Sequence, residues 1–507
     1  MNSTVAVQRT IWLSLVLLSL CLYAIQTNAA ETKPNIIFVI SDDLSWGDLG
    51  CYGQKKIKTP NIDRIATEGM KFTSCYAGNA VCAPSRSGLM QGLHPGHARV
   101  RGNFVGHYRH SLTKDDLTVP MLLKQAGYAT GLFGKWGIGM LGTDGFPTKK
   151  GFDEFVGFAN QHHGKSLYPD HYWRNDMRVS IPENKGFRPP YNRPAKYTAD
   201  GTPIPPGIAN PDKAVYQTDL FHREALKFIR SKANKDKPFF LYYASALPHG
   251  PLIVPDLAPY TNKDWPSIRH KEWAAMITRL DTEVGRILDL LEELKIDDDT
   301  LVFFVSDNGQ SSGGYSGYNR GGTGLSIEEF FKNASPVRGT KGNLYAGGVL
   351  VPALARWPGK IAPGSVSDQP WAFWDFMPTA AELAGAATPK NIDGISIVPT
   401  LLGQSAKQQQ HDYFYWEYGG SRAARFGDYW AHQAKGKRIE LFDLTRDPQQ
   451  RNNLAGKQPE LVAKANRIFK KVHVPSEVWP SPGESNSDFK ARMTKLGNTH
   501  WPNNYSK

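Results

Sequence analysis

The sequence predicts an α/β fold in which a large, mixed but mostly parallel β-sheet is flanked by helices. Three observations support this class. Short runs such as 35–40 and 301–305 are apolar at nearly every position, as expected for strands that are buried on both faces. Segments with helical spacing of apolar residues lie between these runs. Strands that alternate with helices are typical of the crossover connections that a parallel sheet requires.

The expected elements follow one another between residues 34 and 402. Asn35–Ile40 is the first buried strand, and Thr59-Pro60 opens the first helix. The later elements are a helix at Val119–Gln125, a strand at Tyr128–Phe133, a helix at Leu220–Ser231, a strand at Pro238–Ala244, a helix with an apolar stripe from Trp273 to Leu291, and a strand at Leu301–Val305. The stretches 174–213 and 311–342 are rich in Gly, Pro, Asn or Ser and predict long loops.

The pattern changes after His411. Short stretches at 413–418, 422–426, 429–432 and 438–444 are typical of antiparallel strands, and a helix is expected around 460–472. We therefore expect a main α/β domain at residues 31–405 and a smaller C-terminal subdomain, made of an antiparallel sheet plus a helix, at residues 406–507.

The N-terminus resembles a secretory signal peptide at residues 1–30. Arg9 is its only charge, residues 11–25 form an apolar run, and small residues suited to cleavage follow at 27–30. This run is short for a bilayer-spanning helix, which needs about 20 residues. An uncleaved anchor is the alternative interpretation. We expect an exported protein, periplasmic or secreted, without stable membrane insertion.

The composition excludes several classes of protein. With 40% hydrophobic and 21% charged residues, the 507-residue chain is globular and not disordered or fibrous. Four cysteines are too few for a disulfide scaffold. The net charge of +13 favours acidic partners, but no dense Lys/Arg tract occurs, so we expect no nucleic-acid partner.

Oxygen ligands follow two of the predicted strands. Asp42 and Asp43 come after the first strand, and Asp307 and Asn308 come after the strand at 301–305. Ligands bind at the carboxyl ends of parallel strands, so these side chains should meet at one edge of the sheet. Three carboxylates and an amide oxygen suit a hard divalent cation, Ca²⁺ or, as a weaker candidate, Mg²⁺. The alternative is a helix cap at Asp43 and a simple turn after Ser306.

Cationic side chains are expected at the same edge. His249 follows the strand that ends near Ala244, and Lys135 follows the strand that ends at Phe133. Lys341 lies in the glycine-rich stretch 339–342. A metal ion surrounded by Lys, His and Arg side chains is a site for a tetrahedral oxyanion.

The most specific segment is Cys82-Ala-Pro-Ser-Arg86, followed by Gly92. It resembles the signature of the type I, formylglycine-dependent sulfatases of the alkaline phosphatase-like superfamily. Other motifs of that family occur in its order: Asp42-Asp43, His94-Pro-Gly-His97, Lys135-Trp136, Pro248-His249, Asp307-Asn308-Gly309, Lys341 and Leu441-Phe-Asp-Leu444. The resemblance implies an alkaline phosphatase-like fold and arylsulfatase-like chemistry in the domain at 31–405.

The resemblance also implies roles for single residues. Cys82 would be oxidised to formylglycine (3-oxoalanine) by a dedicated maturation enzyme, and its hydrate would act as the nucleophile. The metal ligands would be Asp42, Asp43, Asp307, Asn308 and the modified Cys82. Arg86 would hold the formylglycine hydroxyl, Lys135 and Lys341 would bind sulfate oxygens, and His249 would contact the bridging oxygen, as a general acid for the leaving alcohol.

One departure from the family concerns the second residue after Lys135. Many members have a His there that contacts the formylglycine, whereas this chain has Gly137. His162 or His163, downstream in a polar stretch, is expected to supply the missing imidazole or to contact the sugar; the alternative is a pair of surface loop histidines. A disulfide between Cys51 and Cys75 is possible after export.

The expected substrate is a sulfated carbohydrate. The 13 Trp residues, the positive charge and the predicted export favour a sulfated glycan, because aromatic rings stack on sugars and positive charge attracts a polyanion. The stretch Tyr168–Asn175 is a candidate for sugar contact. The alternatives are a phospho- or phosphonate-diester hydrolase of the same superfamily and a non-catalytic protein that binds sulfated glycans.

Overall fold

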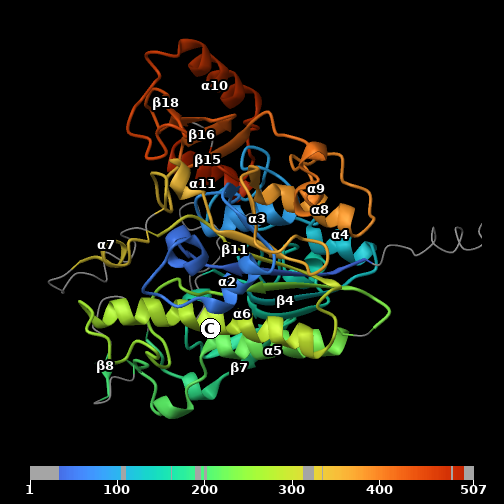
Figure 1. Ribbon diagram of the computed structural model, residues 1–507, viewed down its shortest axis with the longest axis vertical. Helices are drawn as coiled ribbons and strands as arrows, with labels where there is room; N and C mark the ends of the chain where they lie inside the picture. The colour runs from blue at the N-terminus through green and yellow to red at the C-terminus, as the bar shows by residue number, and fades with distance from the viewer. Residues whose placement is uncertain are drawn as a thin grey trace, which may run out of the picture.

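The computed structural model of the chain describes residues 33–103, 110–161, 163–188, 196–198, 203–233, 235–311, 325–333, 335–480 and 484–495 (Figure 1). The predicted signal peptide lies outside these residues. Within the described ranges, no helix combines the length and apolar composition that crossing a bilayer requires.

Ten strands of the described chain form one large sheet, in the order β13-β2-β12-β11-β1-β10-β4-β5-β6-β7. Its middle strands run parallel: β11 (Thr300–Ser306), β1 (Asn35–Ser41), β10 (Phe239–Ala244), β4 (Ala129–Lys135) and β5 (Glu154–Phe158). The outer strands are β12 (Ala353–Arg356), β2 (Met70–Phe72), β13 (Ser365–Ser367), β6 (His171–Arg174) and β7 (Met177–Ser180). Antiparallel pairs occur only among these outer strands and where they join the centre, so the predicted mixed, mostly parallel sheet is confirmed.

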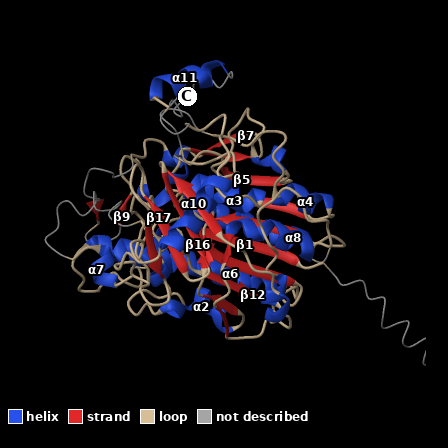
Figure 2. Ribbon diagram, turned by 90° about the horizontal axis from the view of Figure 1, so that it is seen from above, coloured by secondary structure: helices blue, strands red, loops and turns tan. Residues whose placement is uncertain are grey.

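Helices cover both faces of this sheet (Figures 1 and 2). One face carries α3 (Cys82–Gln91), α4 (Val119–Gln125) and α8 (Phe376–Leu383), and the other carries α2 (Pro60–Thr67), α5 (Gln217–Lys232) and α6 (Ile268–Glu293). Strand β1 shows why both faces need a cover. Its side chains alternate, so that Ile37 and Val39 belong to the core under α5 and α6, whereas Phe38 belongs to the core under α3 and α8.

A second, antiparallel sheet follows near the C-terminus. It consists of β15 (Phe414–Tyr418), β16 (Ser421–Phe426), β17 (Tyr429–Gln433) and β18 (Glu440–Asp443). Helix α10 (Pro459–Lys471) packs on one face through Phe469, while Trp416 and Trp430 on the other face pack against Tyr76 of the main domain. Figure 1 shows this sheet and α10 at one end of the molecule. The smaller elements are α7 (Ile327–Phe331), α9 (Val398–Leu401), α11 (Asn486–Lys495), β3 (Cys75–Tyr76), β14 (Trp371–Ala372), β8 (Lys196–Tyr197) and β9 (Pro203–Ile204).

The predicted elements are confirmed with shifts of a few residues at their ends, but two other expectations are corrected. Tyr168 and Tyr172, in the stretch proposed for sugar contact, are buried in the core under α5, so their rings are not available to a sugar. The possible disulfide is also not formed, since Cys51 and Cys75 are both free thiols.

Candidate active site

The carboxyl ends of neighbouring parallel strands bring the predicted polar residues together. β1 pairs with β11 in register up to Ser41 and Ser306, so Asp42 and Asp307 leave the sheet at the same level. The backbone N–H of Asp307 donates to Ser41 O at 3.1 Å, and that of Asp42 donates to Leu247 O, after β10, at 3.0 Å. Three segments far apart in sequence therefore meet at one edge of the sheet.

The acidic residues form a compact, buried group with Cys82. Asp42, Asp43 and Asp307 are each no more than 1% exposed, and one ligand atom from each lies within 4.8 Å of the others and of the Cys82 sulfur. Asn308 Nδ2 donates to Asp43 Oδ1 at 2.7 Å. Its other amide atom, Oδ1, is buried and has no hydrogen-bond partner among the described residues. This oxygen-rich donor set fits a hard divalent cation.

Three cationic side chains pair with these carboxylates. Lys135 Nζ lies 2.6 Å from Asp42 Oδ2, and Lys341 Nζ lies 2.5 Å from Asp43 Oδ1. The Arg86 guanidinium donates to Asp307 Oδ2 from Nε at 3.1 Å and from Nη2 at 2.9 Å, and to the carbonyl of Lys135 from Nη1 at 2.9 Å. Positive charge therefore surrounds the carboxylates.

Burial acts to raise the pKa of all three carboxyls, and the neighbouring charges decide the outcome. For Asp42, Lys135 and the other cations outweigh burial and hold its pKa well below the usual range. Lys341 has the same effect on the pKa of Asp43. Burial and the negative charge of Asp42 raise the pKa of Asp307 to about 6. The mutual repulsion of the carboxylates is a cost that a bound divalent cation would offset.

Cys82 is the first residue of α3, whose side chains are all buried. Pro84 lies in the first turn, where its missing N–H costs no hydrogen bond, and Gly92 ends the helix with φ +70°, in the left-handed region. The helix thus accounts for the spacing of the signature. Its start places Cys82 Sγ 3.5 Å from Asp42 Oδ1 and 3.4 Å from Lys341 Nζ. Burial, followed by the charge of Asp307, raises the pKa of this thiol to about 12.

His249 completes the group. Its Nδ1 lies 2.7 Å from the carbonyl of Gly250, which makes Nδ1 the protonated nitrogen, and its Nε2 faces Asp43 Oδ2 at 3.5 Å. Burial lowers the pKa of the ring to about 4 despite the nearby carboxylates. All nine residues predicted for catalysis and metal binding therefore lie within one cluster, in which His249 and Lys341 are partly exposed and the other seven are buried.

The two other predicted histidines are not part of this cluster. His162 lies outside the described residues. The ring of His163 packs against Phe158 and His171, with 4.2 Å between ring centroids in both cases, and burial lowers its pKa to about 3. The described contacts of His163 are with Phe158, His171 and Asp170 and not with Asp42, Asp43 or Asp307.

Gln161 was missed by the sequence analysis. Gly137 has φ +92°, and a Cβ built on it would lie 2.8 Å from Gln161 Cγ and 2.9 Å from Gln161 Nε2. The Gln161 side chain therefore fills the space beside Gly137, and its Nε2 is buried without a partner among the described residues. The apolar run before it, 155–159, marks a strand, so its place at a strand end was readable from the sequence.

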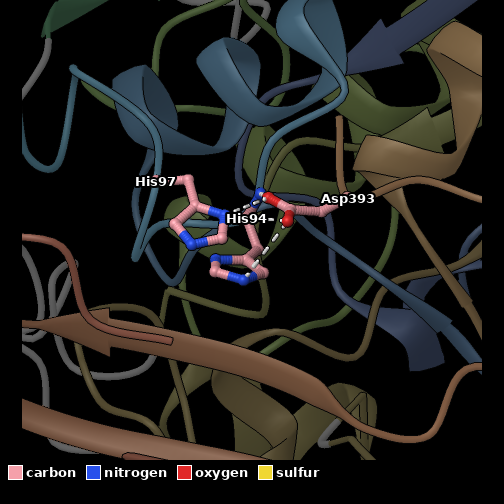
Figure 3. A group of neighbouring side chains, drawn as sticks. All are labelled: His94, His97 and Asp393. Atoms are coloured by element: carbon pink, nitrogen blue, oxygen red, sulfur yellow. Dashed lines mark hydrogen bonds and ion pairs between the residues drawn. The ribbon is translucent and has the colours of Figure 1, made fainter. Parts of the chain in front are cut away.

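A second group of metal-ligating residue types has a different role (Figure 3). Asp393 accepts hydrogen bonds from the backbone N–H of His94 at 2.9 Å and from His97 Nδ1 at 2.8 Å. The N–H of Gly96 donates to His94 Nδ1 at 3.1 Å, so the proton of this neutral ring is on Nε2, where it leaves no lone pair for a cation. This group ties the loop after α3 to the segment before α9.

Comparisons with known proteins agree with this architecture. A family model described as "Sulfatase" matches residues 34–386, and one described as "N-sulphoglucosamine sulphohydrolase, C-terminal" matches residues 340–473. The N-acetylgalactosamine-6-sulfatase of Canis lupus familiaris is 33% identical over 417 residues, which cover 80% of this chain and 72% of that protein. The arylsulfatase A of Homo sapiens is 32% identical over 480 residues, which cover 86% of each chain.

A solved structure gives the same result at the level of the fold. The crystal structure of Ps i-CgsB in complex with k-i-k-neocarrahexaose aligns with a TM-score of 0.70 and 25% identity, and covers 92% of this chain and 98% of that chain. The predicted alkaline phosphatase-like class is thus confirmed. From the family model, the relatives and the shared fold, the chain belongs to the sulfatase family and is a sulfuric ester hydrolase.

Proposed function

We propose that this protein is an exported sulfatase that hydrolyses sulfate esters of a sulfated carbohydrate, with a formylglycine made from Cys82 and a bound divalent cation, Ca²⁺. The observation that carries the proposal is the position of Cys82, at the start of α3 and within 4.8 Å of three carboxylates. The domain division at residues 30 and 405, and cleavage of the signal peptide, are part of the proposal.

The residues around Cys82 support both the bound cation and the formylglycine. Asp42, Asp43, Asp307 and Asn308 would hold the cation, since they present oxygen atoms that Ca²⁺ prefers over the softer thiol. Burial raises the pKa of the Cys82 thiol to about 12, so in the folded protein it is protonated at neutral pH and is a poor ligand and nucleophile, whereas a hydrated aldehyde at this position would offer hydroxyl oxygens. When bound, the cation would polarise the sulfate group, and the hydrated aldehyde would supply the attacking hydroxyl.

The remaining residues would bind and orient the substrate. Lys135 and Lys341, now paired with carboxylates, would donate to sulfate oxygens and stabilise the negative charge that grows in the transition state. Arg86 would hold the start of α3 and Asp307 in place. His249 Nε2 would hold the proton for the leaving alcohol, and a bound sulfate group would oppose the lowering of its pKa.

The relatives support a carbohydrate substrate. The matched curated proteins include N-acetylgalactosamine-6-sulfatases, and the solved structure of Ps i-CgsB contains a neocarrahexaose. We infer that this chain also acts on a sulfated sugar. His163, which lies beyond β5 near Lys135, is proposed to contact that sugar, because a Cβ on its neighbour Gly164 would lie 3.4 Å from the Lys135 side chain.

Two measurements test the proposal. Mass spectrometry of the Cys82 peptide, from a host with the maturation enzyme, is expected to show formylglycine; unmodified Cys82 would favour a non-catalytic binding protein. Release of free sulfate is then measured with defined sulfated mono- and disaccharides, next to an aryl sulfate and an aryl phosphate diester. We expect turnover of the sulfates, loss of activity in a chelator and recovery with Ca²⁺. Turnover of the phosphate diester alone would indicate the other hydrolase of the superfamily.

A further inference from the structure

A cleft of about 370 Å³ lies between the segment that follows β1, residues 46–56, and the segment at the end of α7, residues 331–336. Its lining includes two aromatic rings and three lysines: Trp46, Tyr52, Lys55, Lys56 and Lys332. The cleft is separate from the carboxylate cluster, and nothing in the proposed chemistry uses it.

The cleft lies within reach of the reaction centre. Trp46 follows the proposed ligand Asp43 by three residues, so their Cα atoms are at most about 11 Å apart. The opposite wall is also tied to the active site, because Ser45 Oγ donates to the carbonyl of Asn333, the neighbour of Lys332. Gln310 Nε2 donates to Asn333 Oδ1 at 3.2 Å, and Gln310 O accepts the N–H of Lys341 at 2.7 Å.

One buried side chain holds the walls of the cleft together. Gln54, 8% exposed, accepts the backbone N–H groups of Lys55 and Lys56 on Oε1, both at 2.9 Å. Its Nε2 donates to Gly47 O at 2.9 Å and to Phe331 O at 3.3 Å. The loop with the lysines, the turn with Trp46 and the end of α7 are thus fixed relative to one another before any ligand binds.

The aromatic floor is also ordered. The Trp46 and Tyr52 rings pack with their centroids 4.3 Å apart, and the Tyr52 hydroxyl lies 2.7 Å from the carbonyl oxygen of Phe72 and 2.9 Å from that of Ala353, either of which can accept its proton. Both rings remain partly exposed. A rigid, partly exposed aromatic surface next to cations is suited to the apolar face of a sugar that carries an anionic group.

The charge in the cleft is positive. Lys55 and Lys332 are exposed, and no ion pair of either occurs among the described residues, whereas Lys56 donates to the carbonyl of Phe330 and lies over that ring. Lys332 also has φ +52°, an unusual conformation for a residue other than Gly, and it is held at the end of α7. Two neighbouring carboxylates are engaged in other hydrogen bonds: Asp48 accepts from Asn333 and Trp273, and Glu329 caps α7.

We propose that this cleft binds a second, neighbouring sugar of the substrate through its anionic group, with Lys55 and Lys332 as the cationic partners and Trp46 as the ring platform. This inference rests on the proposed sulfatase function and adds the requirement that the favoured substrate is an oligosaccharide with charge on adjacent units. The anionic group is a sulfate or a carboxylate, since both pair with lysine.

The test compares the full-length, matured wild type with Lys55→Ala/Lys332→Ala and with Lys457→Ala, an exposed lysine of the C-terminal region, as the matched control. Four substrates are used: an aryl sulfate, and disaccharides in which the scissile sulfate sugar has a neutral, a sulfated or a uronic acid neighbour. For the double variant we expect kcat/KM to fall about tenfold with a charged neighbour, equivalent to about 1.4 kcal/mol. The fall should result from a higher KM, with kcat unchanged, and it should become smaller at high salt. For the aryl sulfate and the neutral disaccharide, kcat/KM of the double variant should equal that of the wild type.

The possible outcomes separate the two proposals. If kcat/KM of the double variant falls only with the sulfated neighbour, or only with the uronic acid neighbour, the result supports the cleft and identifies the anionic group that it binds. Equal loss on all four substrates, or no loss with either charged neighbour, overturns the cleft while the sulfatase function stands. If the wild type turns over no sulfate ester, the function fails, and calorimetric binding of the two charged disaccharides to the wild type and the double variant then decides on the cleft: equal affinities refute it.

Discussion

Replacing Arg86 by Met should destabilise the protein far more than an ordinary loss of ion pairs. Arg86 is 0% exposed and makes two hydrogen bonds to Asp307 and one to the carbonyl of Lys135. The Arg86→Met variant leaves the Asp307 carboxylate buried without its partner, which costs about 3–5 kcal/mol. In a domain of this size that free energy corresponds to a fall in Tm of about 5 °C.

Thermal unfolding in EDTA measures this effect without a contribution from cation binding. Arg64→Met is the matched control, because Arg64 also pairs with carboxylates, but at the surface, where such pairs contribute about 0–1 kcal/mol. The decisive variant is Arg86→Met/Asp307→Asn. Since it removes the unpaired charge, it should recover most of the lost stability. A double variant no more stable than Arg86→Met would refute the reasoning.

Three further predictions concern stability. Burial raises the pKa of Glu283 to about 7, so between pH 4.5 and 7 the folded state binds more protons than the unfolded state. The stability that the protonated Glu283 contributes is therefore fully present below pH 4.5 and is lost as the pH rises through 7. Glu283→Gln should therefore reduce the fall in urea unfolding free energy between pH 5 and 8 by about 2.5 kcal/mol. An unaltered pH profile would contradict this. Gly137→Ala should lower the free energy of unfolding by about 1–3 kcal/mol, because the new Cβ is strained by the positive φ and collides with the Gln161 side chain. Adding Gln161→Ala removes the collision, so the Tm of the double variant should lie above that of Gly137→Ala. Asp393→Ala removes the hydrogen-bond acceptor of His94 and His97 and should lower the free energy of urea unfolding by about 1–3 kcal/mol. An unchanged free energy of unfolding would show that these hydrogen bonds do not stabilise the fold.

The sequence was most informative where one local pattern determines the structure. The central strands are apolar on both faces, so their type and their burial were predictable from residues 35–40, 239–244 and 301–305. The strand-end carboxylates were predictable for the same reason, because parallel strands end at one edge of the sheet. The outer strands β6 and β7 were not predicted, since their side chains are partly exposed and their pairing depends on contacts distant in sequence.

The site could be predicted only in part. The nine residues with family motifs lie together, but Gln161 was missed because its importance arises from the space beside Gly137, a tertiary feature. The stretch around Tyr168 was assigned to sugar contact from its composition, although tertiary packing places its tyrosines in the core. The cleft near Trp46 joins segments almost 300 residues apart, and neither segment has an informative pattern by itself.

The burial of α3 limits when the chain can be modified. Cys82 is 1% exposed, every residue of its helix is buried, and the apolar residues of α3 pack in one core with the main sheet, α4 and α8. A second enzyme cannot bring its own catalytic groups to this sulfur once the surrounding layers have assembled. If Cys82 is converted to formylglycine as proposed, the oxidation has to take place on a nascent or still extended polypeptide, and the order of synthesis, modification and folding would then decide whether a given molecule becomes active.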